Sequence, residues 1–380
     1  MLTSVSLPLW ILLILIALSL WAILDHLLMP SVRWMLRRRA NKAIDELNTR
    51  LSLKIQPFKL TKRQVLTENL LYDPEILSAV DKYAKENKMP RDVAMQEARS
   101  YASDIVPSFS AYTYFRVGTG LAKLVSKSLY RIRLGFSQDE RLSGIDPNAS
   151  VVFVINHRSN MDYVLVTFMV AASSALSYAV GEWARVWPIQ GLIRSMGAYF
   201  VRRDSGNPLY RKVLARYVDM ATKAGVVQAM FPEGGLTRDG KLRPPKLGLL
   251  SYIVGDFDPK GERDVVFVPV GVNYDRVLED RILTSDIADK NNKNLRSRFT
   301  TRFLIHYSLH TLWLLIRGRW HRHGYACVSF GAPVSLKAYM EQRSIDFRTL
   351  NEDREREEVD TLGKHLMGAV GKVVPVLPVS

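Results

Sequence analysis

Short apolar runs and longer amphipathic stretches alternate along the chain from Val151 onward. This alternation constrains the fold more than any other feature, because strands that alternate with helices form a sheet covered by helices. We predict an α/β fold with a central, mostly buried mixed sheet flanked by helices. The predicted strands span residues 151–155, 198–201, 226–231, 265–272 and 326–330, and the predicted helices include residues 163–174, 208–223, 247–254 and 351–372.

One predicted strand, at residues 265–272, contains a proline, Pro269. Proline has no N–H to donate to a sheet ladder and is rare in a central strand. We therefore expect this strand to lie at the edge of the sheet or to carry a bulge.

The first predicted strand runs directly into a polar turn, and residues 151–162 read VVFVINHRSNMD. His157 and Asp162 lie in this turn, beyond the carboxyl end of a strand, where ligands collect in α/β sheets. The two side chains can meet in a tight turn, and a carboxylate near a helix N-terminus is favoured by the helix dipole. A carboxylate bonded to one imidazole nitrogen fixes the tautomer and makes the other nitrogen a better base for a hydroxyl. The alternative is an aspartate that only caps the helix, beside a surface histidine.

Residues 5–24 form an uncharged run of 20 residues, rich in Leu, Ile and Trp. This length can span a bilayer, so we predict a transmembrane helix rather than an apolar core helix. No Lys or Arg precedes the run and no small-residue cleavage pattern follows it, which disfavours a signal peptide. By the positive-inside rule the rest of the chain is then cytoplasmic, and a basic cluster beyond the run can bind anionic headgroups. The cluster consists of Arg33, Arg37, Arg38, Arg39 and Lys42.

The formal net charge of the 380-residue chain is +16. Such a charge suits nucleic acid, an anionic membrane surface or phosphorylated substrates. No nucleic-acid-binding motif is recognisable, so we expect no nucleic-acid partner. The single cysteine, Cys327, excludes an internal disulfide and suits a reducing compartment.

Two further polar sites follow predicted strands. Residues 197–203 read GAYFVRR, and strand alternation sends Arg202 and Arg203 to opposite faces, so that one of them can point toward a phosphate. Residues 231–235 read FPEGG and open a glycine-rich loop whose backbone amides can approach a ligand. Candidate ligand-binding residues in this loop and just beyond it are Glu233, Gly234, Arg238, Lys241 and Lys246.

The same loop has most of the spacing of a P-loop at Gly235, Gly240 and Lys241. Position 242 is Leu, where a P-loop has the Ser or Thr that holds magnesium. Pro244 and Pro245 oppose the helix that should follow. We therefore exclude a nucleotide hydrolase.

Residues 303–316 are apolar but too short to span a membrane. With the basic and aromatic residues around their end they suit a membrane surface, and an ordinary core helix fits equally well. These flanking residues are Arg317, Arg319, Arg322, Trp313, Trp320 and Tyr325. His306 and His310 are spaced as on one helix face, but no cysteine or carboxylate cluster accompanies them, so we expect no metal site.

We predict three regions in the chain: an anchor at residues 1–28, a basic and helical region at 29–140, and the α/β domain at 141–380. Within the second region, residues 66–130 are rich in helix formers and are interrupted by three prolines. This pattern predicts a small helical subdomain.

Four blocks in the chain, in this order and spacing, resemble those of the glycerolipid acyltransferase family. They are HRSNMD at 157–162, GAYFVRR at 197–203, FPEGG at 231–235 with its downstream basic residues, and VFVPVGVNY at 266–274. Arg158, which follows the histidine, and the run PPKLG at 244–248 resemble in particular the bacterial glycerol-3-phosphate acyltransferases. One position departs from that subgroup, because Leu236 stands where it usually carries an arginine.

The resemblance implies a membrane-anchored enzyme of phospholipid synthesis at a bacterial inner membrane. It would move a fatty acyl group from acyl-CoA or acyl carrier protein to the sn-1 hydroxyl of glycerol 3-phosphate and give lysophosphatidate. Asp162 would orient His157 as the base, with no metal or bound cofactor, and membrane lipids would be further partners. The residues implied to position the acceptor are Arg158, Ser159, Arg203, Glu233, Gly234, Arg238 and Lys246. The alternatives are lysophosphatidate or another lysolipid as acceptor, and a catalytically idle protein that binds lipid surfaces.

Overall fold

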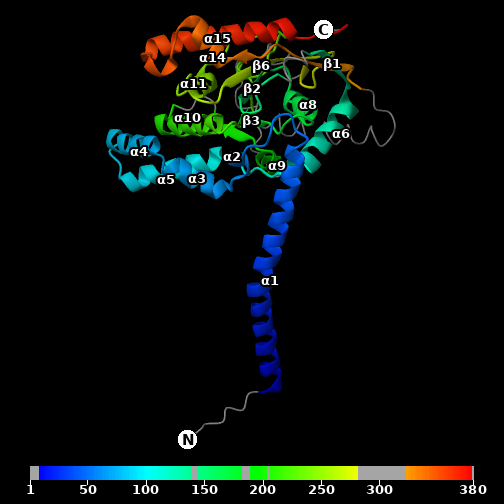
Figure 1. Ribbon diagram of the computed structural model, residues 1–380, viewed down its shortest axis with the longest axis vertical. Coiled ribbons are helices and arrows are strands. Elements are labelled where there is room, and N and C mark those ends of the chain that lie inside the picture. Colours follow the sequence, from blue (N-terminus) through cyan, green and yellow to red (C-terminus); the bar gives the residue numbers. More distant parts are fainter. Residues whose placement is uncertain (1–7, 138–143, 182–188, 203–205, 281–321, 379–380) are drawn as a thin grey trace. The chain divides into compact units, whose positions relative to one another are not determined.

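The computed structural model describes residues 8–137, 144–181, 189–202, 206–280 and 322–378 (Figure 1). The chain divides into two compact units, Met1–Leu51 and Ser52–Ser380, and each is described by itself. The region boundaries predicted at residues 28 and 140 stay predictions. The apolar segment predicted at 303–316 lies outside the described residues.

The first unit contains one long helix, α1 (Leu9–Asn48). Apolar side chains in its first turns are exposed, among them Leu9 (74%), Trp10 (63%) and Trp21 (74%). Among the residues that the structure describes, however, no helix combines the length and the apolar character that a membrane crossing requires. The structure therefore does not bear out the transmembrane helix predicted at 5–24, of which residues 5–7 lie outside the described range.

The second unit is built on a mixed sheet, as predicted, and this sheet has eight strands within the described residues. Its strand order is β1-β7-β6-β2-β5-β3-β4, with β8 paired to β6. Pairing is antiparallel where β6 meets β7 and β8, and parallel elsewhere. The strands are β1 (Arg131–Ser137), β2 (Ser150–Ile155), β3 (Ser177–Gly181), β4 (Tyr199–Val201), β5 (Gln228–Met230), β6 (Val265–Tyr274), β7 (Tyr325–Phe330) and β8 (Val334–Ser335).

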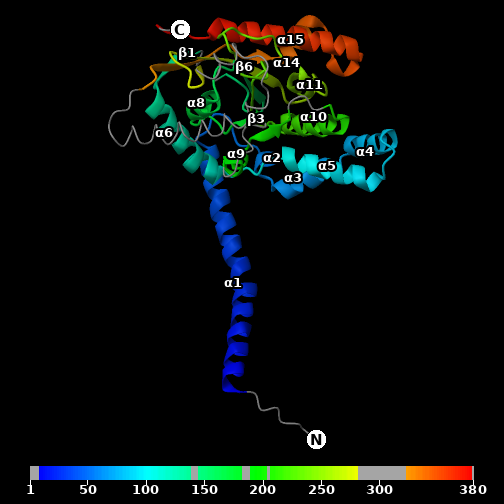
Figure 2. The ribbon, with the colours of Figure 1, turned by 180° about the vertical axis from the view of Figure 1, so that it is seen from behind.

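Helices cover both faces of this sheet. Figure 1 shows α10 and α11 on one side and α6 and α8 on the other, and Figure 2 shows the two layers from behind. The helices of this unit are α2 (Pro57–Leu60), α3 (Arg63–Leu71), α4 (Pro74–Glu86), α5 (Arg91–Ile105), α6 (Thr119–Leu129), α8 (Met161–Val170), α9 (Ile189–Ser195), α10 (Pro208–Lys223), α11 (Gly248–Val254), α14 (Leu336–Arg343) and α15 (Glu352–Val373). The predicted helices at 163–174, 208–223, 247–254 and 351–372 are thus confirmed within a few residues.

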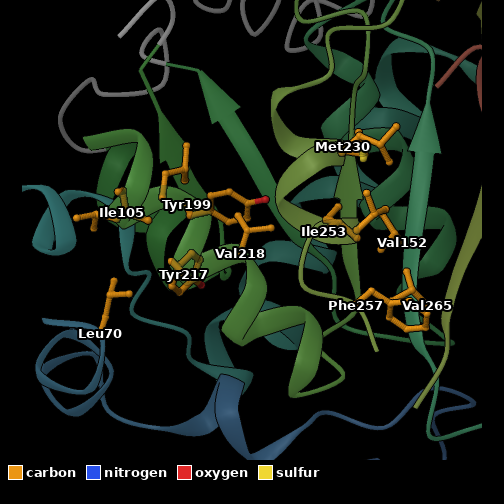
Figure 3. Packing of buried hydrophobic residues seen from close by; sticks show 14 of the residues in the cluster. Leu70, Ile105, Val152, Tyr199, Tyr217, Val218, Met230, Ile253, Phe257 and Val265 are labelled. Carbon is orange, nitrogen blue, oxygen red and sulfur yellow. The ribbon is translucent and has the colours of Figure 1, made fainter. Parts of the chain in front are cut away.

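Strand alternation divides the core into two layers. Val152 and Val154 of β2 belong to the core under α10, α11 and α15, whereas Val151 and Phe153 belong to the core under α6 and α8. Successive side chains of a strand point to opposite faces, so a strand that is apolar throughout must be covered on both sides. Figure 3 shows the first core, which extends from Val152 and Met230 past Tyr217 to Ile105 and Leu70.

The helices predicted between residues 66 and 130 are present, and their breaks fall at the expected prolines. Asp73 accepts a hydrogen bond from the Glu75 backbone N–H at 3.0 Å and caps α4, whose first residue is Pro74. Leu70 of α3 and Ile105 of α5 lie in the same hydrophobic cluster as α10. These helices therefore share a core with the α/β layers.

The edge position predicted for the strand at 265–272 is wrong, because β6 is a central strand between β2 and β7. Pro269 is accommodated because β6 changes neighbours there: its partner is β8 at Val266 and Phe267, and β7 from Val270 onward. The carbonyl of Pro269 accepts the Gly331 N–H at 2.8 Å, so its nitrogen also faces the link between β7 and β8. No ladder donor is needed at that point.

Candidate active site

His157 and Asp162 meet in the turn between β2 and α8. The His157 Nδ1 lies 2.9 Å from Asp162 Oδ2, and both residues are buried, with 3% and 0% of their surface exposed. Asp162 is in the first turn of α8, where a carboxylate is favoured. The contact that the spacing predicts is therefore present. The alternative of a surface histidine does not fit, because His157 is buried.

The Asp162 carboxylate is held on both oxygens. Oδ2 also accepts the backbone N–H groups of Arg158 at 2.7 Å and Ser159 at 3.0 Å. Oδ1 accepts the hydroxyl of Tyr274, at the end of β6, at 2.7 Å. Burial, followed by the charge of Asp162, raises the pKa of Tyr274 well above its usual value, which keeps this hydroxyl a donor. The carboxylate thus has one orientation toward the imidazole.

A second buried carboxylate, Glu279, holds the middle of the same turn. It accepts the Ser159 hydroxyl at 2.7 Å, the Asn160 backbone N–H at 3.0 Å and the Asn160 side-chain amide at 3.1 Å. The Ser159 hydroxyl also accepts the Met161 N–H at 3.1 Å. Ser159, implied to bind substrate, is fully buried and uses its hydroxyl inside the turn.

The glycine-rich loop after β5 holds the backbone of His157. Glu233 Oε1 accepts the His157 N–H at 3.0 Å, and Oε2 accepts the Arg243 N–H at 3.3 Å. The Thr237 N–H donates to the His157 carbonyl at 3.0 Å. Burial raises the pKa of Glu233, while the hydrogen bonds from His157 and Arg243 act in the opposite direction. Glu233, expected at the acceptor, therefore acts on the histidine backbone.

Aromatic rings enclose the imidazole. The Phe231 ring lies 4.3 Å from the His157 ring at an interplanar angle of 34°, and Tyr163 meets it edge-on at 5.5 Å. These contacts restrict the ring rotation of His157 and exclude water from its faces. The imidazole is therefore fixed by rings as well as by the carboxylate.

Cationic side chains lie over the same loop. The Arg158 guanidinium lies beside Gly240, and the Lys246 stem lies against Gly234; both glycines have positive φ, +75° and +65°, and a Cβ on either would approach these cations closely. Burial lowers the pKa of Arg158, and Asp162, Glu233 and Asp239 partly offset this effect. Arg238 is exposed.

The second predicted basic block contributes less than expected. Arg203 lies outside the described residues. Arg202, at the end of β4, donates to Asp104 of α5 at 2.7 Å. Arg202 thus links β4 to α5.

The residues around this site resemble a known protein family. The Acyltransferase family model matches residues 136–273, which include the His157–Asp162 turn, the glycine-rich loop and most of β6. This match, together with the relatives described next, supports the glycerolipid acyltransferase family for this domain.

Curated relatives of the acyltransferase domain are bacterial proteins named glycerol-3-phosphate acyltransferase. Those of Pseudomonas entomophila and Aeromonas hydrophila are 29% and 28% identical to the chain over 76% and 79% of its length. The chain spans about a third of each relative, 34% and 36% respectively. Among solved structures, the 1-acyl-sn-glycerophosphate (LPA) acyltransferase of Thermotoga maritima matches 83% of the chain and 98% of its own, at 16% identity and a TM-score of 0.37.

Three supports of the acyltransferase domain's dyad were not expected from the sequence: Tyr274, Glu279 and Asn156. Asn156 bridges β2 to β6, because its side-chain amide donates to the Val272 carbonyl at 2.9 Å and its oxygen accepts the Val272 N–H at 2.7 Å. A polar residue directly after a buried strand, and a tyrosine at the end of another, are the signals that could have indicated two of them.

Among the described residues, no group of three histidine, cysteine, aspartate or glutamate side chains is arranged to hold a metal ion. His306 and His310 lie outside those residues.

Proposed function

We propose that this chain transfers a fatty acyl group from a thioester to the sn-1 hydroxyl of glycerol 3-phosphate. The observation that carries the proposal is the buried contact between His157 Nδ1 and Asp162 Oδ2, 2.9 Å long, beyond the carboxyl end of β2. The names of the bacterial relatives favour glycerol 3-phosphate as acceptor over lysophosphatidate.

The proposed reaction begins with proton abstraction. Because Asp162 binds Nδ1, the base is Nε2 of His157, which takes the proton of the acceptor hydroxyl. The acceptor oxygen forms a bond to the thioester carbon, the carbon–sulfur bond breaks, and the departing thiolate takes the proton back from the imidazolium. Asp162 stabilises the positive charge that His157 carries in between.

The acceptor phosphate would be bound by the cations over the glycine-rich loop. Arg158, Arg238 and Lys246 supply the positive charge, and the Gly234 backbone permits close approach. Ser159 and Glu233 act on the turn that carries His157 rather than on the phosphate. Arg203 stays a predicted contact.

The acyl donor is proposed to be acyl-CoA or acyl carrier protein, with no resident cofactor or metal. We also propose that the chain works at the cytoplasmic surface of a bacterial inner membrane. The exposed apolar residues of α1 and the basic residues Arg38 and Lys42, which are exposed further along the helix, support contact with anionic lipid.

The test is an acyl-transfer assay with the purified full chain, palmitoyl-CoA or palmitoyl acyl carrier protein, and either glycerol 3-phosphate or lysophosphatidate. We expect lysophosphatidate to form from glycerol 3-phosphate. Product from lysophosphatidate alone would replace the acceptor in the proposal. If neither acceptor gives product with either donor, the proposed acyl transfer is refuted, and binding to a lipid surface is the remaining hypothesis.

A further inference from the structure

A pocket of about 370 Å³ lies at the β1 edge of the sheet, away from the glycine-rich loop. The end of α6, the strand β1 and the residues just before β7 form its wall. The lining residues are Lys127, Tyr130, Arg131, Ile132, Arg133 and Arg322. Four of the six are cationic, and none of the six is acidic.

Tyr325 arranges two of these cations side by side. Arg131 pairs with Tyr325 in the parallel register of β1 and β7, and Arg133 follows on the same face of the strand. The guanidinium carbons of Arg131 and Arg133 lie 6.0 and 5.6 Å from the centre of the Tyr325 ring. Both arginines donate to its hydroxyl, which lowers the pKa of Tyr325.

The phenol orders the two guanidinium groups without neutralising them, because a protonated phenol oxygen accepts hydrogen bonds but carries no full negative charge. The carboxylate of Asp275 is also near, and accepts the Tyr325 backbone N–H at 2.7 Å. Even if Asp275 offsets one charge, three positive charges remain on the pocket. A pocket of this kind attracts an anion.

The pocket is connected to the candidate active site through two aromatic rings. Tyr130 lines the pocket, and its ring lies 5.1 Å from the ring of Tyr274. The Tyr274 hydroxyl donates to Asp162 Oδ1, whereas His157 binds Oδ2 of the same carboxylate. The pocket is therefore linked to the dyad through Tyr130 and Tyr274, and its cations are distinct from Arg158 and Lys246.

We propose that this pocket binds a phosphate oxyanion, supplied by the headgroup of an anionic phospholipid or by a soluble phosphate. Paired guanidinium groups match the oxygen geometry of phosphate, and the added cations Lys127 and Arg322 come from two other segments. The proposal rests on the charge and shape of the pocket and does not depend on acyl transfer.

The test is isothermal titration of the detergent-solubilised full chain with three probes. Inorganic phosphate represents the soluble source, dihexanoyl phosphatidylglycerol the anionic lipid, and dihexanoyl phosphatidylcholine a lipid without net charge. Binding of phosphate alone identifies a soluble ligand, and preference for phosphatidylglycerol over phosphatidylcholine identifies a lipid headgroup. No binding of either anionic probe would overturn the proposal.

Two double variants, each of which removes two positive charges, test whether the probe binds in this pocket. The double variant Arg131→Gln/Arg133→Gln should raise the Kd of the bound probe about tenfold or more, because each removes a hydrogen bond to a charged group. The control Arg354→Gln/Arg356→Gln removes two exposed arginines of α15 and should leave the Kd unchanged. If the first variant unfolds, Lys127→Gln/Arg322→Gln tests the same pocket from other segments. Equal losses in pocket and control variants would mean unspecific charge attraction and would also overturn the proposal.

Discussion

The turn after β2 and the glycine-rich loop after β5 lie side by side at the candidate site but are built differently. The turn is largely buried, and Asp162 and Glu279 accept hydrogen bonds from His157, Arg158, Ser159 and Asn160. The loop has a buried acid, Glu233, on its inner side, whereas its cations Arg238 and Lys246 are exposed.

In the proposed reaction, this difference would separate two tasks. A base must be held at a fixed position relative to the reacting bond, which requires a turn with one conformation. A phosphate needs positive charge and backbone amides, which flexible cations on a loop can supply. We therefore expect changes in the turn to lower kcat, and changes on the outside of the loop to raise KM.

The largest effect should follow from His157→Ala. Loss of a general base lowers the rate about 10²–10⁴-fold, and we expect kcat for acyl transfer to fall by that factor. The control is His365→Ala, which removes an exposed histidine of α15. Unchanged acyl transfer in the His157 variant would refute the assignment of the base and the contrast between the two regions.

The next effect should follow from Tyr274→Phe, which removes one hydroxyl and keeps the ring against Tyr130. Loss of a hydrogen bond to a carboxylate should lower kcat about tenfold without changing KM for glycerol 3-phosphate. Tyr178→Phe is the matched control, since this buried hydroxyl contacts Thr167 at 3.0 Å instead of the dyad. Equal losses of kcat in the two variants would mean that Tyr274 only stabilises the core.

Lys246→Gln should have a smaller effect, and it should change KM rather than kcat. An exposed cation contributes little, so KM for glycerol 3-phosphate should rise about fivefold at most, at unchanged kcat. Steady-state kinetics of this variant and of Lys372→Gln, on the far end of α15, give the comparison. A fall in kcat with constant KM would contradict the division of tasks.

The smallest effect concerns stability and pH. Burial raises the pKa of Glu279 above its ordinary 4.5. The stability that this carboxyl group contributes is therefore fully present below that pH and is lost as the pH rises through the raised pKa. Glu279→Gln does not titrate. The stability advantage of wild type over this variant should therefore shrink from about pH 4 to about pH 8 in urea unfolding experiments. A constant difference across that range would show that burial of Glu279 has no such effect.

The sequence could predict the parts of the site that are local in the chain. His157 and Asp162 are five residues apart, so the turn alone brings them together. Tyr274 and Glu279 are 112 and 120 residues from their partners, and no local pattern reveals such contacts.

The sheet shows the same limit. The sequence predicts β2, β4, β5, β6 and β7, but not β1, β3 and β8. The arginines of β1 give it the composition of an exposed segment. The edge position inferred from Pro269 was wrong for a related reason. A missing N–H destabilises a sheet only where the neighbouring strand offers an acceptor. At Pro269 the neighbour of β6 changes from β8 to β7.

The Asn156 bridge to Val272 has a consequence for the motions of the molecule. The Val272 amide donates to Asn156 between two central strands, and the amides of Arg158 and Ser159 donate to the buried Asp162 carboxylate, so we expect none of the three to be exposed by fraying of a helix end. Their hydrogen exchange should require global unfolding, while the exposed ends of α4 and α15 exchange far earlier. The dyad would then be among the last parts of the fold to loosen on heating.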